Sequence, residues 1–476
     1  MRSYLKYVIA VLLLMPLINC SGEEGERRPN VLLISIDTLR PDHLGCYGYG
    51  RETSPSIDRL AREGVLFENH ISSSSWTLPA HTAMFTSASD SVHGNMEATG
   101  TALSPAFTTV AERFAASGYK TGGFYAGPYL HEAFGLGQGF DTYQNCAETT
   151  ADLASADVEA WAMDPEVMSA SHRGSSNENV YQAARQFMEE RLDQSFFCFM
   201  HLWDVHFDFT PPAPYDTMFD PGYQGDITGE GFFFNPKVRS GQLTAEDKAH
   251  LIALYDGEIR WTDETIKKLL ADLDSWGLDE DTIVVLTSDH GTEFWEHGGI
   301  AHRTTLYDEL IRVPLIVRYP RQLPGNRRVK HQTRIVDIAP TLCELADIPP
   351  MPHSDGSSLR SIALGKPLDF DNVALSELFS VQRRMRSVRT PEAKLIDDMG
   401  VQQRIWFDLQ ADRGELRPRG DLDVGTGADM QALFESSMTR LDNSFSRRPG
   451  APVAPDLPEG VLDSLKGFGY VGTDDE

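Results

Sequence analysis

The sequence is short of cysteine, of basic charge and of long apolar runs, and each shortage excludes a class of protein. Its five cysteines in 476 residues are an odd number without a Cys-x-x-Cys pair, which argues against a disulfide framework and against a cysteine-ligated zinc or redox site. Lys and Arg total 42 against 70 Asp and Glu, a formal net charge of −28, so we expect no nucleic-acid partner. A composition of 41% hydrophobic and 24% charged residues indicates a globular protein.

The first twenty residues have the order of charge and apolar residues that is typical of a secretory signal. Arg2 and Lys6 precede an apolar run over 7–17, which is shorter than the roughly 20 residues of a membrane-spanning helix. The run ends near Cys20 and resembles the lipobox of bacterial lipoproteins. We therefore expect residues 1–20 to be a signal peptide, Cys20 to carry a lipid anchor to the membrane, and residues 21–29 to be a tether. A secreted or periplasmic protein and a retained anchor are the alternatives, and all three place the chain outside the cytoplasm, in the bacterial cell envelope or beyond it.

Apolar runs of strand length alternate with helical patterns along the chain. Runs at 31–36, 196–200, 283–286 and 313–317 predict buried strands, and helical spacing is found at 56–64, near 107–114 and over 244–274. This alternation predicts an α/β fold with a large mixed, mainly parallel sheet sandwiched by helices. The pattern weakens near residue 371, so we expect a catalytic domain over 30–370 and a smaller C-terminal α+β domain over 371–476.

Polar residues follow three of the predicted strands. Asp37 follows the first strand, the segment 201–206 follows the middle one, and Asp289 and His290 follow the third. Since ligands gather at the carboxyl ends of parallel strands, we expect these side chains to converge. Two carboxylates and an imidazole suit one divalent cation. Thr77, at the start of a predicted helix, would place a hydroxyl on that cation and act as a nucleophile; its alternative role is that of an N-cap without chemistry.

Six ordered motifs resemble those of the sulfatase family, which belongs to the alkaline phosphatase superfamily. They cover roughly residues 29–365 and lie at 37–45, 53–58, 77–81, 201–206, 288–291 and 312–315. Segments 407–409 and 468–471 are similar to the family's C-terminal domain. The resemblance implies an alkaline phosphatase-like fold and a hydrolase that cleaves a sulfate or phosphate ester. It also implies a metal site formed by Asp37, Thr77, Asp289 and His290.

The same resemblance implies roles for other polar side chains. Thr77 takes the nucleophile position, and His206 and His302 lie near the leaving group, so these three residues are expected to be catalytic. Substrate binding is expected from His81, His201 and Arg303. The segment 207–243 is rich in Pro, Gly and Phe and lacks helical periodicity, so we interpret it as a flap that faces the substrate, or else as a packed insert.

The metal implied by the resemblance is calcium, but a histidine ligand is also compatible with manganese, magnesium or zinc. A second cation site is an option at Asp204, His206 and His302; alternatively Asp204 hydrogen bonds to the His206 ring.

The main departure from the family is Thr77, because sulfatases have a cysteine or serine there that is oxidised to formylglycine. Threonine cannot form that residue, so a covalent intermediate on Thr77 must be cleared by attacking water. Three functions remain: a hydrolase of sulfate or phosphate esters, an envelope phosphotransferase or phosphodiesterase with a phospho-threonine intermediate, and a degenerate family member that only binds an anion. The substrate would be a small molecule, a glycan or a lipid headgroup that carries an anionic ester.

Overall fold

The structure is a computed structural model that describes residues 27–97, 100–147, 176–231, 235–367, 372–380 and 383–458. The predicted signal peptide, Cys20, most of the tether and the segment 468–471 lie outside these ranges. Among the described helices, none has the length and apolar character needed to cross a bilayer.

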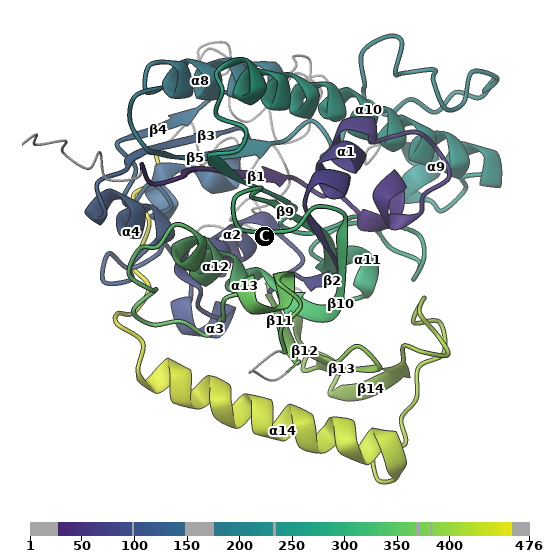
Figure 1. Ribbon diagram of the computed structural model, residues 1–476. Helices are drawn as coiled ribbons and strands as arrows, with labels where there is room; N and C mark the ends of the chain where they lie inside the picture. The colour runs from purple at the N-terminus through teal and green to yellow at the C-terminus, as the bar shows by residue number, and fades with distance from the viewer. Residues whose placement is uncertain are drawn as a thin grey trace, which may run out of the picture.

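An eight-stranded sheet organises the main part of the molecule, in the order β10-β2-β9-β6-β1-β5-β3-β4 (Figure 1). Only β9 of these eight runs against the others, so the predicted mixed, mainly parallel sheet is confirmed. The strands are β1 (Asn30–Ile36), β2 (Val65–Ile71), β3 (Lys120–Tyr125), β4 (Thr142–Asn145), β5 (Phe196–Leu202), β6 (Thr282–Thr287), β9 (Arg312–Arg318) and β10 (Arg327–Arg334).

Helices cover both faces of the sheet, and every residue of its strand β1 is therefore buried. Successive side chains of a strand point to opposite faces, so Val31 and Leu33 pack into one hydrophobic core while Leu32 and Ile34 pack into another. The first core includes α2 (Thr77–Thr86), α4 (Val110–Ala116) and α12 (Ile338–Leu345). The second includes α1 (Pro55–Glu63), α8 (Ser176–Glu189) and α10 (Ala245–Ser275), and Figure 1 shows the two helix layers on opposite sides of the sheet.

The long helix α10 begins where the sequence predicts it. Thr244 is its N-cap, and a capping box joins the side chains of Thr244 and Asp247 to each other's backbone amides. The helix α4 ends before Gly118, which has a positive φ of 87°. These local signals therefore set the ends of two helices that cover the sheet.

A second, antiparallel sheet follows the first one in the chain, in the order β11-β12-β13-β14. Its strands are β11 (Ala374–Phe379), β12 (Arg384–Arg389), β13 (Ala393–Asp398) and β14 (Gln403–Asp408), and α14 (Gly425–Ser446) packs on it through Met430 and Phe434. The smaller elements are α3 (Asp90–His93), α9 (Pro236–Arg239), α11 (Asp308–Ile311), α13 (Arg360–Ala363), β7 (Glu293–Phe294) and β8 (Ile300–Ala301). The smaller C-terminal α+β part is thus present, while the boundary at residue 370 stays a prediction.

Candidate active site and metal centre

Three neighbouring strands bring the predicted site residues together. β1 lies between β5 and β6, with Ser35 of β1 paired to His201 on one side and to Thr287 on the other. Asp37 directly follows β1, and Asp289 and His290 follow β6. The convergence expected at the carboxyl ends of the strands is therefore found in the structure.

Four side chains form a compact, buried group at these strand ends. The His290 Nε2 atom lies 3.3 Å from Thr77 Oγ1, 3.6 Å from Asp37 Oδ1 and 3.4 Å from Asp289 Oδ2. Thr77 is the first residue of α2, so its hydroxyl also lies at the positive end of a helix dipole. Asp37, Asp289 and His290 form one of the groups whose donor atoms could hold a metal ion together.

The protonation pattern of this group suits a cation. His290 Nδ1 lies 2.8 Å from the carbonyl oxygen of Gly291 and therefore carries the hydrogen, which leaves the Nε2 lone pair directed at the group. Asp37 Oδ1 and Asp289 Oδ2 are buried and have no hydrogen-bond partner among the described residues. Burial raises the pKa of Asp37 from 3.8 to about 6, although His290 and Thr77 act in the opposite direction. Two unsatisfied carboxylate oxygens and one imidazole lone pair fit a divalent cation.

A second group with the spacing of metal ligands, Glu293, His297 and Glu309, lacks an available imidazole lone pair. His297 Nδ1 lies 2.6 Å from Glu309 Oε1, and Nε2 lies 3.1 Å from the carbonyl oxygen of Glu415. Both partners are acceptors, so both ring nitrogens carry hydrogen. Burial disfavours this charge, but the hydrogen bond to Glu309 outweighs it and raises the pKa of His297. This group is an ion pair between an imidazolium and a carboxylate.

His81 and His201 lie buried beside the metal group, and their predicted contact with substrate stays a prediction. Both are fully buried, and His81 Nδ1 donates to the Thr77 carbonyl at 2.9 Å while its Nε2 lies 3.1 Å from Ser35 Oγ. His201 Nε2 donates to Asp37 Oδ2 at 3.2 Å. Burial lowers the pKa of His81 to about 3 and that of His201 to about 4, so both rings are neutral. In this structure the two rings contact the Thr77 backbone and the Asp37 carboxylate.

Solvent reaches the group from the side of Thr77 and His302. These two residues are 7% and 8% exposed, whereas Asp37, Asp289 and His290 are exposed by 1% or less. The His302 ring centroid lies 4.5 Å from that of His290 and 5.0 Å from that of His206. Thr77 and His302 are therefore the more exposed residues around the three buried ones.

Arg303 brings positive charge to the same side. Its amide donates to the Ser75 carbonyl at 3.0 Å, its guanidinium lies 4.2 Å from the Trp76 ring centroid, and its Nη1 donates to Tyr129 Oη at 3.1 Å. These contacts fix the guanidinium beside the residue that precedes Thr77. The predicted contact of Arg303 with substrate stays a prediction.

Asp204 does not join His206 and His302, so the second cation site is not formed by these residues. The Asp204 carboxylate accepts hydrogen bonds from Ser176, from the Asn177 amide at 3.1 Å and from Trp261 Nε1 at 3.2 Å. His206 Nδ1 donates instead to the carbonyl oxygen of Phe207 at 2.7 Å. Asp204 follows β5 closely in the chain but is turned toward α8 and α10, which strand-end position could not reveal.

The bracing of the Asp37 backbone was not predicted. Thr38, the next residue, has a positive φ of 54°, an uncommon conformation for a β-branched residue. Tyr255 of α10 holds this turn, because its hydroxyl donates to the Thr38 carbonyl at 2.9 Å and accepts from the Arg40 amide at 3.0 Å. No motif in the sequence links Tyr255, in the middle of a long helix, to the turn at Thr38.

The sheet, the strand-end site and the helix that presents Thr77 define the chain as a hydrolase of the alkaline phosphatase superfamily that acts on sulfuric or phosphoric esters. A sulfatase family model matches residues 29–348, so the chain belongs to the sulfatase family. A model of the C-terminal region of N-sulphoglucosamine sulphohydrolase matches residues 295–441.

Relatives of known sequence and structure agree with this family. An uncharacterised sulfatase, YidJ of Escherichia coli, is 27% identical over 350 residues, which cover 68% of each chain. An ulvan-active sulfatase of Formosa agariphila is 27% identical over 393 residues, which cover 77% of this chain and 72% of the relative. The crystal structure of a phosphonate monoester hydrolase of Agrobacterium radiobacter superimposes with a TM-score of 0.72 at 22% identity, over 88% of this chain and 96% of that one.

Proposed function

We propose that the protein is a metal-dependent hydrolase that cleaves a sulfate or phosphate ester with Thr77 as its nucleophile. The observation that carries this proposal is the position of the Thr77 hydroxyl, 3.3 Å from His290 Nε2 in a buried group with two unsatisfied carboxylate oxygens. Family relatives include proteins named for sulfate esters and for phosphonate esters, which supports this substrate class.

Asp37, Thr77, Asp289 and His290 would hold the cation. Bound there, a divalent cation supplies positive charge that lowers the pKa of a neighbouring hydroxyl and stabilises charge on the ester oxygens. Calcium is the ion expected from the family, and the His290 ligand also suits manganese, magnesium or zinc. The neutral His81 keeps the first turn of α2 in place through the Thr77 carbonyl.

The reaction follows from the side chains that face the entrance. The Thr77 hydroxyl would lose its proton to solvent, and the resulting alkoxide would attack the sulfur or phosphorus of the ester. The bond from that atom to the alcohol oxygen breaks, and His206 or His302, in its protonated form, delivers a proton to the alcohol oxygen. Water then attacks the sulfo- or phospho-threonine and gives a proton to the same histidine, the bond to the Thr77 oxygen breaks, and the Thr77 alkoxide and the free oxyanion are released.

His302 enters this scheme as a neutral ring. Burial, together with the nearby His290, His206 and Arg303, lowers the pKa of His302 well below its ordinary value. An anionic ester beside the ring favours its protonated form, so substrate binding would prepare the acid. Arg303 would contact the oxyanion from the side of Trp76.

Incubation of the metal-loaded protein with aryl sulfates, aryl phosphate mono- and diesters and aryl phosphonates tests the proposal. Release of the phenol together with free sulfate, phosphate or phosphonate supports a hydrolase. Transfer of the phospho group to an added alcohol, which then replaces water as the acceptor, would instead support the phosphotransferase, which uses the same threonine intermediate. Complete inertness toward the panel would support an anion-binding protein without turnover.

We also propose that the protein acts in the bacterial cell envelope, anchored through a lipid on Cys20. The order of charge, apolar run and cysteine in residues 1–20 supports this. Expression of the full chain in bacteria, followed by mass spectrometry of the mature N-terminus, tests it. An acylated Cys20 in the membrane fraction is expected, whereas a protein that is released when Cys20 is intact would contradict the anchor.

A further inference from the structure

Thr38 follows Asp37 directly, and its side chain is directed at the loop after β5. The Thr38 Oγ1 atom donates a hydrogen bond to the carbonyl oxygen of Val205 at 3.0 Å. Val205 precedes His206, one of the two histidines proposed as the acid. The hydrogen bond therefore joins the turn that carries a proposed metal ligand to the loop that carries a proposed acid.

The backbone of Thr38 ties this residue to the proposed metal centre. Its amide donates to Asp289 Oδ1 at 3.4 Å, and its carbonyl oxygen accepts from the Tyr255 hydroxyl at 2.9 Å. The amide of the preceding Asp37 donates to the Leu202 carbonyl at 2.9 Å. The Thr38 hydroxyl thus projects from a backbone that is anchored beside both carboxylates.

The peptide between Val205 and His206 is held on both sides. Its amide, which belongs to His206, donates to the Trp203 carbonyl at 2.9 Å within the loop, and its carbonyl oxygen accepts from the Thr38 hydroxyl. The ring of His206 lies beyond this peptide, with its centroid 5.0 Å from that of His302. The contact with Thr38 therefore sets the His206 backbone relative to the end of β1.

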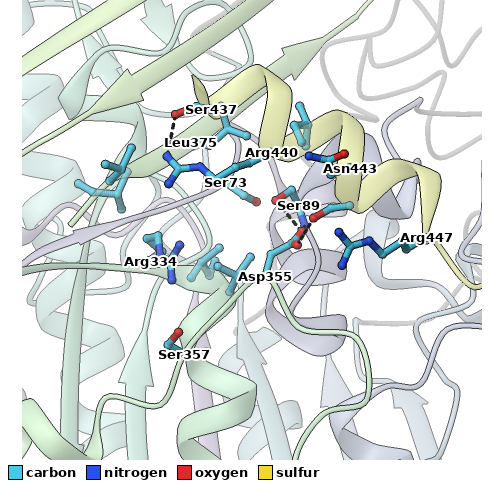
Figure 2. A pocket seen from close by; sticks show the side chains of 16 residues that line it. Ser73, Ser89, Arg334, Asp355, Ser357, Leu375, Ser437, Arg440, Asn443 and Arg447 are labelled. Atoms are coloured by element: carbon cyan, nitrogen blue, oxygen red, sulfur yellow. Dashed lines mark hydrogen bonds between the residues drawn. The ribbon is translucent and has the colours of Figure 1, made fainter. Parts of the chain in front are cut away.

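Both partners of this hydrogen bond lie in packed protein. Thr38 is 1% exposed and Val205 is fully buried. A cavity of about 420 Å³ under α14, with Ser73, Arg334 and Asp355 in its wall, includes neither of them in its lining (Figure 2). Without the Thr38 hydroxyl, the Val205 carbonyl would lose this donor at a place that water does not reach readily. A buried carbonyl without a partner is costly, so the loop is expected to move until the carbonyl finds another donor.

We propose that Thr38 is a positioning residue for the reaction at Thr77, because its hydroxyl holds His206 in the place from which the ring protonates the leaving group. Proton transfer requires a donor within hydrogen-bond reach of the alcohol oxygen, so a displacement of about 1 Å slows it strongly. The inference rests on the proposed function and adds to it that His206 is the acid. Loss of the Thr38 hydroxyl should slow the departure of the alcohol and leave cation binding intact.

Two variants remove the hydroxyl in different ways. Thr38→Val keeps the branched shape of the side chain, whereas Thr38→Gly also removes the strain of the positive φ of 54°. In both variants, kcat for alkyl esters is expected to fall at least about tenfold more than kcat for nitrophenyl esters, since a nitrophenolate leaves without protonation. KM and the affinity for the cation, measured by calorimetry, should stay close to the parent values.

Thr38→Ser and Thr282→Val complete the set of variants. Thr38→Ser keeps a hydroxyl at the same place and should restore the rate on alkyl esters. Thr282 is a matched control, because it is also fully buried and donates to a backbone carbonyl, that of Leu278, at 2.8 Å. It is the first residue of β6, at the opposite end of that strand from Asp289, so Thr282→Val should leave the ratio of the two rates unchanged.

Unchanged rates in Thr38→Val and Thr38→Gly, equal losses on both kinds of ester, a loss of cation affinity or an inactive Thr38→Ser would each overturn the proposal. If the parent hydrolyses no ester, the proposed function fails, and the position of His206 is tested by nuclear magnetic resonance of protein with isotope-labelled histidine. The His206 ring signal, identified by its absence from His206→Gln, should shift in Thr38→Val and Thr38→Gly and return in Thr38→Ser. A ring signal that is the same in the parent and in both hydroxyl-free variants would contradict the positioning role, whether or not the parent is active.

Discussion

The stability of the metal-free protein should depend on pH through Asp37. Burial raises the pKa of this carboxyl from 3.8 to about 6 in the folded chain. Between these values the folded state holds a proton that the unfolded state has released, so the free energy of unfolding falls as the pH rises. A shift of about two units corresponds to a loss of about 3 kcal/mol above pH 7, with roughly half of it reached by pH 5.

A divalent cation beside Asp37 should remove this loss, because it stabilises the ionised carboxylate. The increase in unfolding free energy on metal addition is therefore expected to be larger at pH 7.5 than at pH 5, by about 1–2 kcal/mol. Denaturant unfolding with and without a chelator at the two pH values measures it. In the Asp37→Asn variant, the metal response and its pH dependence should both be lost.

Two results would refute this reasoning. A metal-dependent increase that is equal at pH 5 and pH 7.5 would show that Asp37 does not titrate between these values in the metal-free protein. A full metal response in Asp37→Asn would show that this carboxylate is not part of the cation site.

Three further predictions concern the nucleophile, the acid and the link between the two sheets. Thr77→Val keeps the side-chain shape but removes the hydroxyl, so hydrolysis should fall by a factor of about 10³ or more in steady-state assays while Thr77→Ser retains activity; an active valine variant would exclude the nucleophile. His206→Gln and His302→Gln should lower the rate of hydrolysis of alkyl esters more than that of nitrophenyl esters if the altered ring is the acid, because a nitrophenolate leaves without protonation. An equal loss of rate on both substrates would indicate a positioning role. Lys394 is fully buried between two carboxylates, at 3.1 Å from Asp308 and 2.8 Å from Glu415. Lys394→Met should therefore lower the unfolding free energy by about 3–5 kcal/mol, whereas Lys366→Met, at an exposed position, should change it little. Equal stability of the two variants in denaturant titrations would contradict this.

The sheet could be predicted from the sequence where its strands are buried on both faces. The runs at 31–36, 196–200 and 283–286 are continuously apolar because helices cover both sides, and each lies within an observed strand. β10 gave no such signal, because its sequence RRVKHQTR is mostly polar and it lies at an edge of the sheet, paired only to β2. An edge strand that faces solvent lacks the apolar pattern on which the prediction depends.

The candidate site could be predicted where position in the chain also fixes direction in space. Asp37, Asp289 and His290 follow parallel strands, and the strand register brings them together. The orientation of Asp204 and the burial of His81 depend on contacts with α8, α10 and β1 that are distant in sequence. For such residues the sequence indicates the neighbourhood but not the role.

Mass spectrometry of the acid-quenched, metal-loaded protein during turnover tests the central claim most directly. If the Thr77 oxygen is the nucleophile, a peptide that contains Thr77 should gain the mass of a sulfo or phospho group, and the gain should be absent from Thr77→Val. Product formation at full rate without any modified Thr77 peptide would contradict the account, since an attacking water or another residue would then perform the displacement.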